Sequence, residues 1–111
     1  DLSENGCKVF IERQQARPGQ GVSSMFATGM GYGLWIGICG GLRLPIEVVS
    51  PISWTKEILR GVPGEGKGRN ILGAKRLFPD QDLRKSDRAR VPHDGICDAL
   101  LISEYGWRLS S

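Results

Sequence analysis

Two short strand-like segments separated by a long Gly-rich segment constrain the fold of this chain most. Residues 8–12 ("KVFIE") and residues 44–51 ("LPIEVVSP") each read as a strand, and a proline ends the second. Between them, residues 21–42 predict a helix with Ser23 or Ser24 as its N-cap. Alternation of strand, helix, strand and helix is typical of parallel strands with helices on the faces of the sheet. The sequence therefore predicts an α/β fold.

The second half of the chain predicts helices and one charged loop. "ISWTKEILRG" predicts a helix capped at Ser53, "RNILGAKRLFP" a helix that ends at a proline, and "HDGICDALLISEYGWRL" a final helix. The loop "DQDLRKSDRARVP" separates the last two helices. A length of 111 residues allows a single domain, so residues 1–111 are expected to form one.

Glycines recur every four residues in the first predicted helix. Gly29, Gly33 and Gly37 share one helical face, which allows the close approach of another backbone from the core, a second subunit or DNA. Core packing is the favoured interpretation. The longest apolar run, "MGYGLWIGICGGL", has 13 residues, five of them Gly, which is too short to cross a bilayer. We therefore expect no membrane partner.

Positive charge is concentrated in one part of the chain. Residues 60–90 carry nine Lys or Arg against four acids, whereas residues 1–53 carry four of each sign. A local basic surface suits a phosphate backbone, and it also suits an ordinary solvated face.

The three cysteines have no paired spacing. Cys7, Cys39 and Cys97 are far apart and odd in number, which predicts reduced thiols rather than a zinc site or a disulfide framework. Since no signal peptide is visible, we expect an intracellular protein that is not secreted.

Acidic residues stand at two places that call for a partner. Glu12 follows directly on an apolar strand, where it either marks the strand's exit into water or serves a site. Asp94 and Asp98 are four apart on the last helix, next to His93, the only histidine. Like charges at this spacing repel unless something positive lies between them, and carboxylates suit Mg²⁺. Together with the basic loop, these acids predict metal-assisted phosphodiester cleavage.

Several segments resemble the RuvC-type Holliday-junction resolvases, in particular their phage and chloroplast (monokaryotic-chloroplast) branch. They are "VFIERQ", "QGVSSMFATGMGYGLWIGI", "VVSPISWTKEIL" and "PHDGICDALLISEYG", which together cover about residues 8–106. The resemblance implies an RNase H-like fold, with a mixed sheet flanked by helices. It also implies a homodimer that cleaves four-way DNA junctions with Mg²⁺ or Mn²⁺, in a bacterial or phage-host cytoplasm or an organelle stroma.

The resemblance also implies roles for individual residues. Glu12 would be the strand-end metal ligand, Asp98 the last-helix ligand, and Asp94 or His93 its upstream companion. Lys67 matches a position at which family members carry a basic residue facing the DNA. The remaining residues expected to contact phosphate are Arg69, Arg84, Lys85, Arg88 and Arg90.

The chain departs from the family pattern in three ways. Family members begin with a β-hairpin whose first strand supplies an essential Asp; this chain starts just before "KVFIE", so we expect that hairpin to be missing and Asp1 not to replace its Asp. Gln15 stands where bacterial members often place an aromatic wedge. The last two acids are four apart rather than three, which leaves His93 and Asp94 as alternatives.

Three functions follow from these observations. The first is a metal-dependent junction endonuclease, or its C-terminal portion. The second is a non-catalytic fragment that binds branched DNA, and the third is a dimerisation module that uses the Gly-rich helix and the tryptophans only for packing.

Overall fold

The computed structural model describes residues 6–110 and divides the chain into two compact units, Asp1–Ser50 and Pro51–Ser111. The described part contains four helices and one small parallel sheet of two strands, which confirms the α/β class. The prediction of one domain over residues 1–111 stays a prediction.

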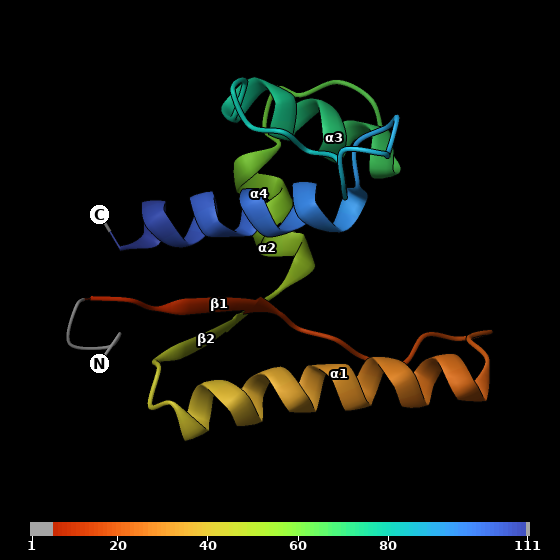
Figure 1. Ribbon diagram of the computed structural model, residues 1–111, viewed down its shortest axis with the longest axis vertical. Coiled ribbons are helices and arrows are strands. Elements are labelled where there is room, and N and C mark those ends of the chain that lie inside the picture. The colour runs from red at the N-terminus through yellow and green to blue at the C-terminus, as the bar shows by residue number, and fades with distance from the viewer. Residues whose placement is uncertain (1–5, 111) are drawn as a thin grey trace. The chain divides into compact units, whose positions relative to one another are not determined.

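The first unit is a strand, a long helix and a second strand. β1 (Val9–Glu12) pairs in parallel with β2 (Ile46–Val49), in a register that places Val9 beside Ile46 and Glu12 beside Val49. The helix α1 (Val22–Gly41) connects them and lies along one side of the strands (Figure 1). The predicted parallel pairing is therefore confirmed.

The start of α1 differs from the prediction. Its N-cap is Gly21, and no side chain caps the first turn, so Ser23 and Ser24 are both inside the helix. The Ser24 hydroxyl instead accepts a hydrogen bond from Gln20 Nε2 at 3.0 Å. At the other end, Arg43 has a φ of 58°, and this left-handed residue turns the chain from α1 toward β2.

The glycine face of α1 is not core, contrary to the favoured interpretation. Gly29, Gly33 and Gly37 are exposed, and a Cβ atom built on any of them meets no other atom within 4 Å. Large apolar residues beside this face are exposed as well; Phe26 is 68% exposed and Trp35 is 63% exposed. The reason is that, within the first unit, no described side chain comes within 4 Å of where these Cβ atoms would stand.

The length of α1 also revises the argument about membranes. Its 20 residues extend beyond the 13-residue apolar run, and by length and composition alone they are enough to cross a membrane. A helix that packs against protein meets the same criterion, so this feature by itself assigns no location.

The second unit consists of three helices around a small core. α2 (Pro51–Ile58) and α3 (Gly66–Leu77) both pack on α4 (Asp94–Leu109). α2 begins at Pro51. The backbone N–H of the first helical residue has no partner within the helix, so proline, which lacks this N–H, is well suited to the position. The predicted cap Ser53 therefore lies inside the helix. The largest fully buried side chains are those of Trp54, Leu59, Cys97 and Leu101.

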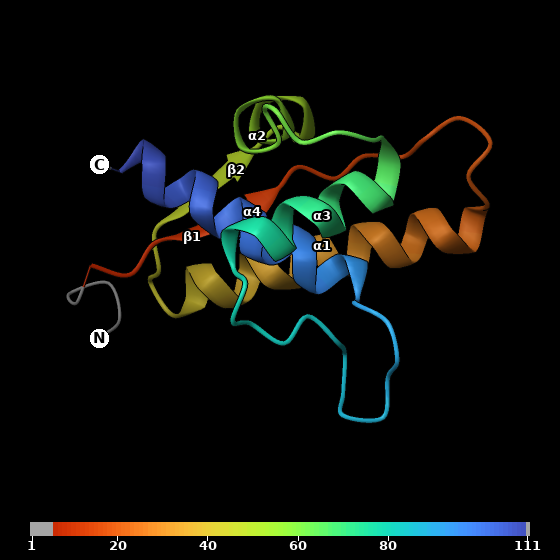
Figure 2. The same cartoon turned by 90° about the horizontal axis from the view of Figure 1, so that it is seen from above.

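Close packing of the second unit depends on one glycine. A Cβ atom at Gly73 would lie 2.5 Å from Leu59 Cδ2, so any larger residue would force this buried leucine, just after α2, to move. The charged loop between α3 and α4 extends away from the two helices that it joins (Figure 2).

Candidate metal and DNA-binding site

The first turn of α4 is fixed by a histidine. His93 is the N-cap, and its Nδ1 atom accepts a hydrogen bond from the Ile96 backbone N–H at 3.3 Å. A Cβ atom at residue 95 would lie 2.9 Å from His93 Cε1, so Gly95 makes room for the ring over the helix end. His93 therefore has a structural role at this helix start, in addition to the predicted role at the site.

Asp94 is paired with a lysine from α3. Lys67 Nζ lies 3.2 Å from Asp94 Oδ2; the lysine side chain is exposed and the aspartate side chain is half-buried. The hydrogen bond and the positive charge of Lys67 lower the pKa of the Asp94 carboxyl below its usual value. Lys67 thus keeps Asp94 ionised, and it supplies the positive partner that the spacing of the two aspartates requires.

Asp98 also has a partner on α3. Asn70 Nδ2 donates a hydrogen bond to Asp98 Oδ1 at 2.9 Å, in a partly buried position. Sequence reasoning missed Asn70, although the signal was present: it follows Lys67 by three residues and so lies on the same face of α3. Two residues of α3 therefore hold the two carboxylates of α4.

The thiol between these carboxylates is inert. Cys97 is fully buried, and burial, together with the negative charges of Asp98 and Asp94, raises the pKa of its thiol. A protonated, buried thiol is neither a nucleophile nor a metal ligand at neutral pH.

Glu12 lies in the first unit, as the last residue of β1. Its neighbour Arg13 donates a backbone hydrogen bond to Val49 O at 2.8 Å, so the strand pairing continues to the point at which the carboxylate emerges. The side chain is half-buried. The expected position at a strand end is confirmed, and its role as a metal ligand stays a prediction.

No group of three or more His, Cys, Asp or Glu side chains within residues 6–110 is arranged to hold a metal ion. The pair Asp94 and Asp98 fits a hard cation such as Mg²⁺, because both offer carboxylate oxygens from one helix face. Asp1 lies outside the described residues.

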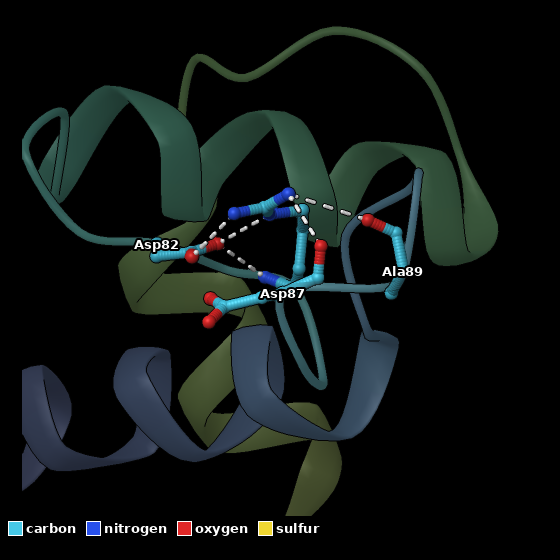
Figure 3. A network of polar contacts seen from close by, with 4 residues as sticks. Asp82, Asp87 and Ala89 are labelled. Atoms are coloured by element: carbon cyan, nitrogen blue, oxygen red, sulfur yellow. Dashed lines mark hydrogen bonds and ion pairs between the residues drawn. The ribbon is translucent and has the colours of Figure 1, made fainter.

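The charged loop is organised by Arg84. Its Nε and Nη2 atoms each lie 3.0 Å from a different carboxylate oxygen of Asp82, and Nη1 donates to the carbonyls of Asp87 and Ala89 at 3.4 Å (Figure 3). The hydrogen bonds from Arg84 lower the pKa of the Asp82 carboxyl to about 2. Arg84 therefore shapes the loop from within.

The other predicted phosphate-binding residues differ in exposure. Arg69 is tied to the loop after α2, with Nη2 2.7 Å from Leu59 O and Nε 2.9 Å from Val62 O. This gives Arg69 a structural role that its sequence position did not reveal. The three remaining predicted phosphate contacts, all on the loop, are exposed: Lys85, Arg88 and Arg90.

A comparison with models of known protein families finds no match, and a search of curated protein sequences finds no match either.

Proposed function

We propose that this chain is a metal-dependent endonuclease of the RuvC type, with an RNase H-like fold, that cleaves four-way DNA junctions. The observation that carries the proposal is the facing pair of helices in the second unit, where Lys67 and Asn70 of α3 hold Asp94 and Asp98 of α4. A carboxylate pair beside a lysine suits a divalent cation and the phosphate that it activates.

Two further features support this function. Glu12 stands at the end of a strand within a parallel strand–helix–strand unit, as the resemblance implies. Exposed cations on the loop before α4, Lys85, Arg88 and Arg90, suit the DNA backbone. Mg²⁺ or Mn²⁺ would be held by Glu12, Asp98 and Asp94, and its chemistry would be the activation of water and the stabilisation of the leaving oxygen.

Cleavage of a synthetic four-way junction in the presence of Mg²⁺ tests the proposal. Glu12→Gln and Asp98→Asn should each abolish symmetric nicking, while Glu47→Gln, which removes an exposed carboxylate paired with Lys8, should leave it intact. Binding of the junction that weakens with salt but never leads to nicking would instead make the chain a non-catalytic binder of branched DNA.

The proposed enzyme acts as a homodimer, and α1 is the surface that we assign to self-association. The helix contains no charged residue. A ridge of Val22, Phe26, Met30, Leu34 and Ile38 runs beside the glycine stripe, and each of these five side chains is more than half exposed.

The geometry of this surface suits a second copy of the same helix. Ridges formed by residues four apart pack into grooves formed at the same spacing, so two copies of α1 complement one another. At ~150–200 Å² for each large side chain, and with exposures between 51% and 80%, the ridge offers roughly 450–650 Å², more than half of the ~800 Å² per partner of a standard interface. Sedimentation at increasing concentration should show a dimer, and Phe26→Glu should leave the chain monomeric.

A further inference from the structure

A second basic surface lies on the second unit, at the opposite end of α4 from the two aspartates. It is a groove made of two adjoining hollows of about 410 and 400 Å³. Both hollows are lined by Glu57, Arg60 and Arg108, so they adjoin at these three side chains. Lys56 lines one end of it and Arg76 the other.

The shape of the groove is set by helix packing. Gly73 lies in its wall, and the close contact that this glycine allows with Leu59 holds α3 beside the end of α2. The groove is therefore built into the core contacts of the unit rather than formed by loose surface side chains.

The charges of the groove are mostly positive. Arg60 lies 3.4 Å from one carboxylate oxygen of Glu57, and Arg108 lies 3.9 Å from the other. Arg108 also lies 3.4 Å from Glu104, so four cations face two carboxylates. Exposed ion pairs of this kind are weak, and a phosphate oxygen can take the place of a shared carboxylate.

The position of the groove relates it to the aspartates. Arg108 follows Asp94 by fourteen residues on one helix, which separates them by roughly 21 Å along its axis. Phosphates of one strand advance by about 3.4 Å along a duplex, so this separation corresponds to about six base pairs.

We propose that this groove binds the phosphodiester backbone of one junction arm, about six base pairs from the site of cleavage. The inference rests on the proposed function and names a part of the DNA that the aspartate end of α4 does not contact. Three of its four cations are arginines, whose planar guanidinium groups match phosphate oxygens with paired hydrogen bonds.

Two adjacent residues of α3 provide a matched test. Arg76 lines the groove and Lys75 does not, and both are exposed. Binding of the full chain to a fluorescent four-way junction with 15-base-pair arms is measured by anisotropy from low to high salt. Arg76→Gln should lower the slope of log affinity against log salt by about one, and Arg60→Gln with Arg76→Gln should weaken binding roughly tenfold at low salt.

The DNA provides the complementary test. Methylphosphonate linkages placed five to seven base pairs from the junction centre remove the phosphate charge there. They should weaken binding by the unaltered chain, and they should have no further effect on the double variant.

The outcomes separate this inference from the proposed function. Equal salt slopes for Arg76→Gln and Lys75→Gln, with nicking retained, would overturn the proposed DNA binding by the groove and would be consistent with the proposed nuclease activity. A reduced slope for Arg76→Gln in a chain that never nicks would support the groove and overturn the nuclease. Circular dichroism of each variant confirms that the helices are intact.

Discussion

Replacing the glycines of α1 with alanine should stabilise the monomer and weaken self-association, and the two effects can be measured separately. Gly29, Gly33 and Gly37 have open space where a Cβ atom would stand, so alanine introduces no clash within one chain. Each replacement removes a helix-interior glycine, which costs about 0.5–1 kcal/mol relative to alanine. The triple variant should therefore raise the free energy of unfolding of the monomer by about 1.5–3 kcal/mol.

Self-association should change in the opposite direction. If a second copy packs on the glycine stripe, three added methyl groups hold the helices apart, and the dimer weakens. Urea unfolding followed by far-UV circular dichroism, at a concentration below dimer formation, measures the first effect; with an m-value of about 1–3 kcal/mol/M, the midpoint should rise by roughly 1 M. Sedimentation measures the second. An unchanged or lower urea midpoint for the dilute monomer would refute the conclusion that the three glycines face open space.

Three other predictions follow from contacts in the second unit. Lys67→Gln should raise the pKa of Asp94 toward its ordinary value, so the acid limb of the nicking rate should shift to higher pH in a pH–rate profile. Because the pKa of Asp82 is lowered to about 2, its contact with Arg84 should be complete above about pH 4 and be lost as the pH falls through 2; NMR of the arginine Nε–H should show this, and loss already near pH 5 would contradict it. Gly73→Ala should lower the free energy of unfolding by about 1–3 kcal/mol in urea titrations, since its Cβ atom overlaps the facing leucine, and a neutral effect would argue against the close approach.

Local patterns in the sequence predicted the strands and helices well. The structure has a strand at the apolar run before Glu12 and helices over the segments of α1 and α4. In each case the spacing of apolar residues fits the period of that element. Their alternation was also enough to predict the parallel pairing of β1 with β2, because adjacent parallel strands need a crossover helix.

Contacts between side chains and distant backbone could not be predicted in the same way. Arg69 and Arg84 were predicted as phosphate contacts, which stays a prediction; that their guanidinium groups also bind backbone carbonyls of loops was not foreseen. Nothing in the periodicity of a helix reveals which carbonyls lie open nearby. The helix caps failed for a similar reason: serine is a good cap, but Pro51 and Gly21 occupy the positions where the chain enters α2 and α1.

The partners of Asp94 and Asp98 come from a single helix, α3. A movement of that helix therefore changes the surroundings of both carboxylates together. Lys67 and Asn70 are three residues apart on α3, so any tilt or slide of α3 along α4 moves both partners together. Gly73 controls how closely α3 seats and lies one further turn along the same helix. A change at that glycine is therefore transmitted to both acids at once, although it touches neither of them.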